Sequence, residues 1–480
     1  MKRFREDDLW VVRERRTQTG VAKSQKTNRV QLSLLILLAL GLLLVAIFIT
    51  IALISQHLTE PGMISESIPL PEPSDVVPGI LPETEIPPLV IALNRIEWSP
   101  AFEALADKFE TEKSVDVEVL LISGYEDYYA TMKNLESSNE FPDLFLINGP
   151  EEASLWSQQL EDLSEEPWVG KTPFALVSGQ QVVGFPIDLA GSGLIYNKSL
   201  LDQAGIDPAT LTNRSAWGIA LQTLEKKKKL LGINAPLALA LNDGRQQIWS
   251  NSRILLNIYL SSGMTYKNSL LVNQLQKGEV EKVRFQQFAD YLDLLFRHSE
   301  PEILLQGTLQ DQYRAFSEGR TVFTLGSSDL DPSLQAAGVT FERGFIPFGA
   351  YTPDTNGIFA EPTGWLVLSR SSPNSDLAQK FLQNLANQDS YQAVLSNKAN
   401  VLPAMHNQMQ TLGNSLQKDL FRWNQAGHIY DMSPDQLPLN LGADFWGPLF
   451  EQLAAQTITS QQFVERASRS ISDLAHEQGS

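Results

Sequence analysis

The longest hydrophobic segment of the chain covers residues 32–54, which carry no charged side chain. As a helix rising about 1.5 Å per residue it would span roughly 34 Å, slightly more than the ~30 Å hydrocarbon core of a bilayer. It begins too late and is too long for a cleavable signal peptide. Lys23, Lys26 and Arg29 precede it, and the next basic residue is Arg95. The pattern therefore predicts an uncleaved single-pass anchor with the N-terminus in the cytoplasm and the rest of the chain outside.

The segment that follows, residues 55–88, contains eight prolines and no Lys or Arg. It has neither helical nor strand periodicity, so we expect an extended spacer of the polyproline type.

From residue 89 the pattern changes to short apolar runs at 89–93, 115–122 and 142–147, with a polar helical stretch at 126–137. Strands separated by helices predict an α/β fold with a parallel sheet. The last part of the chain is predicted to be rich in helices.

Composition narrows the possible functions. The 480 residues include no cysteine, which excludes disulfides, thiolate metal sites, cysteine nucleophiles and a lipid-bearing cysteine. The formal net charge is −19, and it is divided unevenly, because the basic tail 1–31 begins with nine basic and four acidic side chains. An acidic body argues against a nucleic-acid partner.

We find no complete catalytic motif in the sequence. Gly191 and Gly193 could begin a nucleotide fingerprint or a serine elbow, but Tyr196 and Ala190 stand where a further glycine is needed. We interpret this stretch as a close backbone crossing. The five histidines are scattered, so we expect no metal and no cofactor. The basic run 226–229 is interpreted as a solvated helix end.

Seven ordered blocks resemble the family 1 extracellular solute-binding proteins of ABC importers, the group that includes maltose-binding protein. The blocks are 102–122, 142–145, 182–208, 215–230, 316–328, 363–385 and 397–404. Two positions depart from the family pattern, since Ala216 replaces the usual Thr and Gly218 the usual acid.

The resemblance implies that residues 89–480 form a two-lobed, type II-like periplasmic-binding-protein clamp, with ligand between the lobes. It implies strand crossings near 185–192, 345–350 and 395–402. Lobe 1 would then comprise about 89–187 and 348–395, and lobe 2 about 192–345 and 400–480.

The same resemblance, with the aromatic and polar chemistry that sugars require, implies a set of ligand contacts. The set is Glu97, Trp98, Asn148, Asp188, Arg245, Gln247, Trp249, Ser327, Trp365 and Trp446. Ser327 and Ser328 stand where relatives commonly place an aromatic platform. Each residue also has a structural alternative: packing for the tryptophans, turn capping for Asn148 and Gln247, and a hinge hydrogen bond for Asp188.

These inferences predict a membrane-anchored receptor that captures a sugar or oligosaccharide outside the cell for an ABC permease, without catalysis. A ligand-sensing ectodomain working with a separate signal transducer is one alternative. An anchored glycan-processing enzyme is another, because a carboxylate pair suited to hydrolysis depends on spacing in three dimensions. We also expect replacement of Trp98 or Trp365 by Ala to weaken ligand binding while leaving the fold intact.

Overall fold

The computed structural model describes residues 87–241, 249–405, 412–438 and 441–479. The chain divides into two units, Met1–Glu83 and Thr84–Ser480, and the described residues belong to the second unit. The predicted tail, the membrane segment 32–54 and nearly all of the spacer lie outside the described residues. Within the described ranges, no helix is both long and apolar enough to cross a bilayer.

A first sheet has the strand order β2-β1-β3-β11-β5-β4. Its strands are β1 (Leu89–Leu93), β2 (Val117–Leu121), β3 (Leu144–Ile147), β4 (Leu176–Ser178), β5 (Gln181–Pro186) and β11 (Trp365–Leu368). The first three are the predicted strands, and β1 pairs in parallel with both β2 and β3. The predicted parallel α/β start is thus confirmed. The late strand β11 lies antiparallel between β3 and β5.

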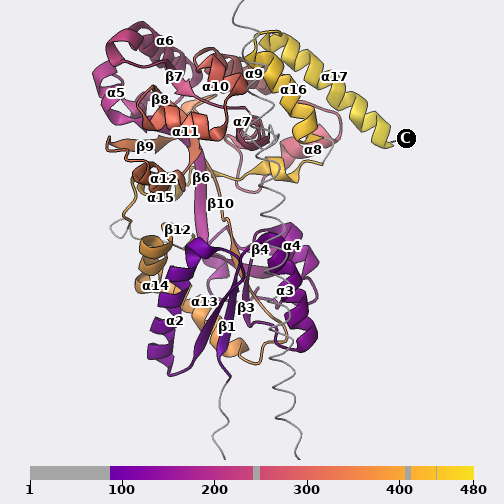
Figure 1. Ribbon diagram of the computed structural model, residues 1–480. Helices are drawn as coiled ribbons and strands as arrows, with labels where there is room; N and C mark the ends of the chain where they lie inside the picture. Colours follow the sequence, from indigo (N-terminus) through magenta and orange to yellow (C-terminus); the bar gives the residue numbers. More distant parts are fainter. Residues whose placement is uncertain (1–86, 242–248, 406–411, 439–440, 480) are drawn as a thin grey trace, which may run out of the picture. The chain divides into compact units, whose positions relative to one another are not determined.

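Helices cover both faces of this first sheet (Figure 1). They are α2 (Ser99–Lys113), α3 (Tyr125–Ser138), α4 (Pro150–Leu155), α13 (Ser375–Asn387) and α14 (Asp389–Val394). Helix α2 has Pro100 in its first turn, and it buries Leu105 and Phe109 against one face together with Phe381 of α13. Met132 of α3 and Trp156 pack on the other face. We call this sheet with its helices the first lobe.

A second sheet has the order β13-β10-β6-β8-β7, and β9 and β12 also pair with β6. Its strands are β6 (Asp188–Asn197), β7 (Ala235–Ala238), β8 (Thr321–Ser327), β9 (Arg343–Ile346), β10 (Ile358–Glu361), β12 (Leu402–Pro403) and β13 (Ile429–Tyr430). Strands β7 and β8 are parallel, whereas β6 is antiparallel to β8, β9 and β10. This sheet with its helices is the second lobe.

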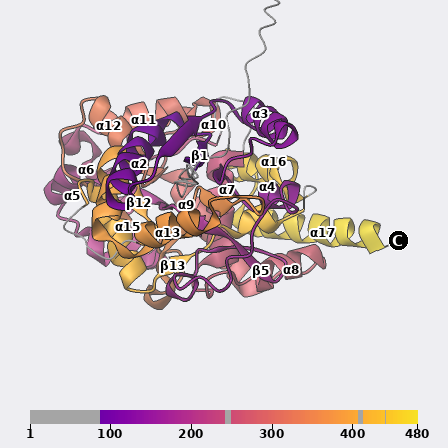
Figure 2. The ribbon, with the colours of Figure 1, turned by 90° about the horizontal axis from the view of Figure 1, so that it is seen from below.

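Eleven helices of the second lobe lie among the described residues, and α17 continues past α16 to the C-terminus (Figure 2). They are α5 (Lys198–Ala204), α6 (Arg214–Leu231), α7 (Trp249–Ser261), α8 (Leu270–Gln276), α9 (Lys282–Arg297), α10 (Pro301–Gln306), α11 (Leu309–Ser317), α12 (Leu330–Ala336), α15 (Ser415–Gln425), α16 (Ala443–Ala454) and α17 (Ser460–Gly479). Helix α6 begins where the Asn213 side chain accepts a hydrogen bond from the Ala216 amide. Its last turn holds Lys228 and Lys229, so the predicted placement of the basic run at a helix end is confirmed.

The chain passes between the lobes at three places, and β6 and β10 of the second sheet extend toward the first sheet in Figure 1. Ile187 separates β5 from β6, residues 362–364 separate β10 from β11, and residues 395–401 lead into β12. The second crossing corrects the prediction of 345–350, because β9 and β10 both pair with β6. Strand β10 is buried and apolar at three of its four positions, so sequence alone does not reveal which sheet it joins.

The glycine pair in β6 confirms the predicted close crossing of backbones. A Cβ atom on Gly193 would lie 2.7 Å from the Ile346 carbonyl oxygen, and one on Gly191 would lie 2.7 Å from Leu420 Cδ1. Only a residue without a side chain lets β9 and α15 approach β6 this closely.

Candidate functional site

Polar side chains follow neighbouring strands of the first sheet at their carboxyl ends. Arg95 lies two residues beyond β1, and Asn148 comes directly after β3. The Arg95 Nη2 atom donates to Asn148 Oδ1 at 3.0 Å, and Nη1 donates to Thr363 Oγ1 at 2.6 Å. The guanidinium also donates to the Thr363 carbonyl oxygen. Arg95 therefore ties two adjacent strand ends to the crossing between β10 and β11.

Asp188 joins this group from the crossing between β5 and β6, directly after Ile187. Asp188 is 2% exposed, and its carboxylate accepts hydrogen bonds from the Thr363 amide at 2.8 Å and the Thr363 hydroxyl at 2.7 Å. Burial raises the pKa of Asp188, although the two Thr363 hydrogen bonds and the positive charge of Arg95 oppose the increase. The hydrogen bonds link the two crossings directly, which is the hinge role considered for this residue.

The second lobe contributes Asp329, which follows β8. Ser328 fixes this turn, because its hydroxyl accepts from the Gly191 amide at 3.0 Å. Although Asp329 is exposed to water, the protein groups around its carboxylate and the negative charge of Asp188 raise its pKa to about 6. The two carboxylates thus come from different strands, Asp188 from the start of β6 and Asp329 from the end of β8, and the charge of one affects the other. We call Arg95, Asn148, Asp188, Asp329 and Thr363 the polar junction.

Glu152 sets the orientation of Asn148. Both Asn148 nitrogens donate to this buried carboxylate, the amide N–H at 3.0 Å and Nδ2 at 2.9 Å. The Asn148 side-chain oxygen therefore points to Arg95. In this arrangement Asn148 does not cap the following helix α4, whose N-cap is Gly149.

Trp98 is 2% exposed, which differs from the expectation of a ring face open to ligand. The Arg95 guanidinium lies 4.5 Å above its ring centroid, and Phe102 stacks at 6.5 Å with an interplanar angle of 14°. Gly364 lies against the ring edge, because a Cβ there would be 3.0 Å from Trp98 Cη2. The indole thus supports Arg95, while its neighbour Glu97 is exposed.

The other two described tryptophans of the expected set are also packed inside. Trp365 is 8% exposed and donates its indole N–H to the Phe174 carbonyl oxygen at 2.8 Å. Trp446 has no exposed surface and stacks on Phe450 in the core of the second lobe. Burying an indole ring removes more apolar surface from water than burying a small side chain does, so burial stabilises the fold more. This gain favours the packed position of these rings. All three tryptophan side chains are packed in this structure, and their role as ligand contacts stays a prediction.

The remaining expected contacts divide into two groups. Ser327 is half-buried, and its hydroxyl accepts from the Asp329 amide at 3.3 Å, so it shapes the turn that carries Asp329. Arg245 and Gln247 lie outside the described residues. Trp249 begins α7, but its side chain also lies outside what the structure describes.

Sequence reasoning missed three members of the polar junction: Arg95, Asp329 and Thr363. A signal existed for Arg95, which follows β1 just as Glu97 and Trp98 do. Asp329 adjoins the two serines noted at the end of β8. No local signal marks Thr363, because its role depends on partners 175 and 268 positions away in the chain.

A second charged cluster lies beside the junction, at the end of β10. Glu361 pairs with Arg253 of α7 at 3.5 Å, and Arg253 also forms an ion pair with Asp435. Burial raises the pKa of Glu361 to about 7; Arg253 opposes the increase, and Asp435 and Asp431 add to it. The carboxylates of Glu361, Asp431 and Asp435 thus outnumber the guanidinium of Arg253 in this cluster.

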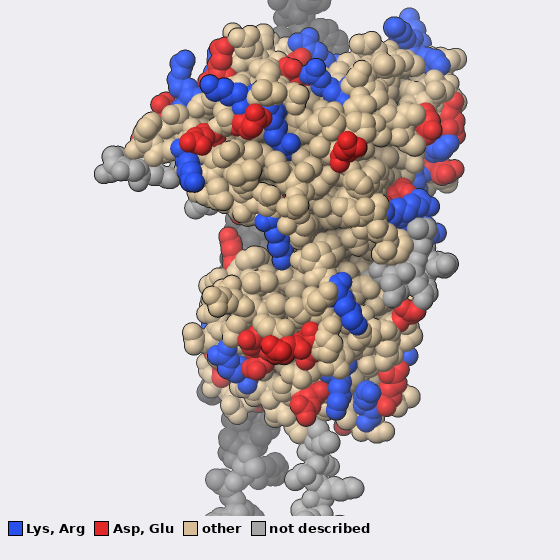
Figure 3. Space-filling view, turned by 180° about the vertical axis from the view of Figure 1, so that it is seen from behind, with Lys and Arg blue, Asp and Glu red and all other residues tan. Residues whose placement is uncertain are grey.

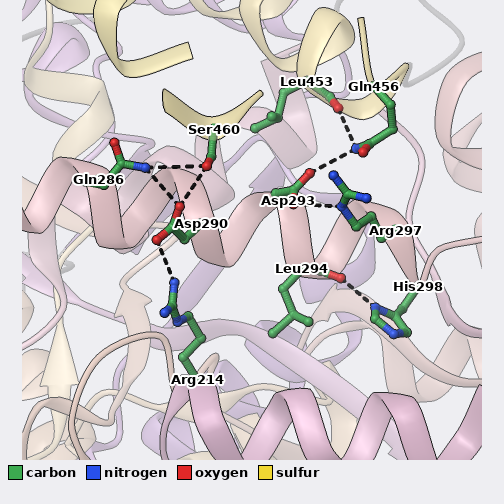
Figure 4. Close-up of polar contacts among 10 residues, drawn as sticks. All are labelled: Arg214, Gln286, Asp290, Asp293, Leu294, Arg297, His298, Leu453, Gln456 and Ser460. Atoms are coloured by element: carbon green, nitrogen blue, oxygen red, sulfur yellow. Dashed lines mark hydrogen bonds and ion pairs between the residues drawn. The ribbon is translucent and has the colours of Figure 1, made fainter. Parts of the chain in front are cut away.

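A hollow of about 360 Å³ lies on the second lobe between α6 and α9. Figure 4 shows its charged side chains paired with one another. Arg214 donates to Asp290 at 2.8 Å, Arg297 to Asp293 at 2.7 Å, and Ser460 to Asp290 at 2.7 Å. These contacts join α6, α9 and the start of α17, so we assign the network to the packing of the lobe.

The outer surface carries charged side chains of both signs. On the face shown in Figure 3, acidic and basic side chains are mixed over both lobes. Among the described residues, no group of three or more His, Asp and Glu side chains could hold a metal ion.

Two α/β lobes joined by strand crossings, with polar groups of both lobes at the crossings, define the class of two-lobed solute-binding proteins. The family model for bacterial extracellular solute-binding proteins matches residues 104–419. The chain therefore belongs to this family, as its sequence blocks suggested.

Individual relatives are distant. The melibiose/raffinose/stachyose-binding protein MelE of Bacillus subtilis is 23% identical over 389 residues, covering 78% of this chain and 86% of MelE. A putative binding protein of Bacillus subtilis in an open conformation has a TM-score of 0.60 at 20% identity, covering 83% of this chain and 100% of that one. The apo form of RafE from Streptococcus pneumoniae has a TM-score of 0.62 at 13% identity, covering 81% and 99%. The structural likeness shows that the two-lobed fold is shared.

Proposed function

We propose that this protein is a receptor that binds an oligosaccharide outside the cell and delivers it to an ABC permease. One observation supports the proposal above the others: Thr363 joins Arg95 of the first lobe to Asp188 of β6, and the charge of Asp188 acts on Asp329 at the end of β8. A ligand that contacts both lobes can favour one lobe arrangement over another, which couples binding to closure. The name of the MelE relative supports a saccharide as the ligand.

The chemistry of the junction suits a neutral polyhydroxylated ligand. Carboxylates accept hydrogen bonds from hydroxyl groups, and a guanidinium and an amide offer donors to ring and hydroxyl oxygens. Asn148 and Asp188 keep their place among the proposed contacts, and Arg95, Asp329 and Thr363 join them. The proposed role is binding without catalysis, so Asp188 acts as a hydrogen-bonded hinge residue rather than as an acid or nucleophile.

We further propose that residues 32–54 hold the receptor in the cell membrane, with residues 1–31 in the cytoplasm. The support comes from the length of the apolar run and from the basic residues before it. Residues 55–88 would then separate the binding domain from the bilayer on the extracytoplasmic side. Protease treatment of intact cells should remove the binding domain and spare an epitope placed at the N-terminus; protection of both ends would contradict this topology.

Calorimetric titration of the full chain in detergent with melibiose, raffinose and stachyose tests the proposed function. We expect saturable binding of at least one saccharide without any cleaved product. Arg95→Met should weaken that binding by about 1.5–3 kcal/mol, because a charged hydrogen-bond donor is lost from a half-buried site.

Arg297→Met is the matched control, since this ion-paired arginine lies on the outside of the second lobe. Its binding constant should equal that of the unmodified protein. Absence of heat with every saccharide, or release of monosaccharides during incubation, would contradict the proposal.

A further inference from the structure

One segment of the first lobe reaches into the core of the second. Phe174 precedes β4, whose strand belongs to the first sheet, yet its ring is 3% exposed in a cluster built from the second lobe. Its neighbours in that cluster include Leu189 of β6 and Leu420 of α15. Among the described residues, Phe174 is the one member of this cluster that precedes residue 187.

Two residues between α7 and α8 meet this segment from the second lobe. The Tyr266 ring packs edge-to-face on Phe174, with centroids 5.2 Å apart at 84°. The Lys267 ammonium donates to the Ala175 carbonyl oxygen at 3.2 Å. Lys267 holds a left-handed backbone with φ of 62°, an uncommon conformation for a residue with a side chain. We call Phe174, Ala175, Tyr266 and Lys267 the inter-lobe contact.

The inter-lobe contact is connected to the polar junction through the crossing 362–364 and the two residues that flank it, Glu361 and Trp365. Trp365 donates to the Phe174 carbonyl oxygen at 2.8 Å, and two residues earlier Thr363 holds both Asp188 and Arg95. At the other end of the crossing, Glu361 lies near Tyr266, where burial and the Glu361 charge raise the pKa of the tyrosine hydroxyl. Thr363 in the middle thus belongs to the junction, while Trp365 is hydrogen-bonded to the inter-lobe contact and Glu361 acts on it through its charge.

Space for relative movement lies beside Phe174. A hollow of about 440 Å³ is lined by residues 171–174 and 386–387 of the first lobe and by Ala404, Asn424 and Gln425 of the second. Met405, which packs against the core of the first lobe, also lines it. The lobes therefore touch at the aromatic pair and stand apart next to it. Contacts of this kind can stabilise one lobe arrangement over another.

We propose that the inter-lobe contact stabilises the described lobe arrangement and thereby sets ligand affinity at the polar junction without touching the ligand. Phe174 and Lys267 act as positioning residues that hold the crossing through Trp365. The effect on affinity rests on the proposed function, whereas the effect on lobe arrangement does not. The populations of two arrangements determine apparent affinity whenever only one binds well.

Distance measurements between two spin labels test this proposal on the full chain in detergent. The chain has no cysteine, so Asp107→Cys on α2 and Gln222→Cys on α6 place one label on the exposed surface of each lobe. Without ligand, Phe174→Leu and Lys267→Met should each broaden or shift the inter-label distance distribution. Both should also change the saccharide dissociation constant in the same direction, by at least about threefold.

Matched controls separate this effect from a general loss of stability. Phe341→Leu removes an edge-to-face pair with Phe316 at 5.4 Å in the same cluster but within the second lobe. Lys133→Met removes an ion pair with Glu136 at 2.8 Å on α3 of the first lobe. Both controls should keep the distances and affinity of the unmodified protein.

Unchanged distances in both Phe174→Leu and Lys267→Met would overturn the proposal. Altered distances with an unchanged dissociation constant would overturn the link to affinity. Altered distances with no saccharide bound by any variant would uphold the effect on lobe arrangement and contradict the proposed function instead.

Discussion

Individual residues of the polar junction act through contacts that sequence does not reveal. The pattern after β1 pointed to Trp98 as a ligand platform, but Arg95 occupies the ring face at 4.5 Å. A guanidinium over an indole is stabilised by roughly 0.5–2 kcal/mol, and the arrangement fixes Arg95 while burying the ring. Because Trp98 is 2% exposed, its replacement by Ala should also disturb the core, contrary to the expectation of an intact fold.

Asp329 makes stability depend on pH with a defined sign. Its pKa is about 6 in the folded protein against 3.8 as the ordinary value, so between these values the folded state binds more protons than the unfolded chain. The contribution of Asp329 to stability is therefore greatest below pH 3.8 and declines as pH rises through 6. Asp329→Asn should raise the melting temperature at pH 7.5 more than at pH 4, as measured by circular dichroism.

Asp473→Asn serves as the control, because this exposed carboxylate lies on α17 away from the junction. The change in melting temperature that Asp473→Asn causes should not vary with pH in the same way. An equal effect of Asp329→Asn at both pH values would contradict the raised pKa.

At the scale of helices and strands, the local sequence pattern predicts some features correctly and others wrongly. The three early strands and α3 follow their predicted ranges, since alternation and apolar runs are local properties. The crossing predicted at 345–350 lies instead at 362–364, because β10 pairs with β6. The pairing of a buried strand is decided by which sheet edge is available.

Two glycines at the element scale should respond to Ala in opposite directions. Gly193→Ala places a Cβ 2.7 Å from the Ile346 carbonyl oxygen and should lower the free energy of unfolding by about 1–3 kcal/mol. Gly218→Ala lies in α6 with no atom within 4 Å of the added Cβ, and it should raise that free energy by roughly 0.5–1 kcal/mol. Urea unfolding of the two variants measures both changes, and a shared sign would contradict the packing of β6.

At the scale of the whole molecule, the proposed binding mode requires both lobes to respond to ligand. Hydrogen exchange with a bound saccharide should slow in residues 94–98 and 148–152 of the first lobe and in 327–330 of the second. Ligand contacts and lobe closure reduce local opening in all three segments. Slower exchange confined to one lobe would contradict a site shared by both, while α17 provides an internal reference far from the crossings.

The sequence by itself determined the local features of this protein: the apolar run, the proline-rich spacer, the early strands and helices, and the ordered blocks of its family. Tertiary structure alone decided which polar groups meet. Asn148 and Asp188 were among the expected residues, but Thr363 joins them only because β11 inserts between β3 and β5 and brings together partners 268 positions apart. Periodicity depends on neighbours in the chain, whereas convergence depends on the order of strands in a sheet.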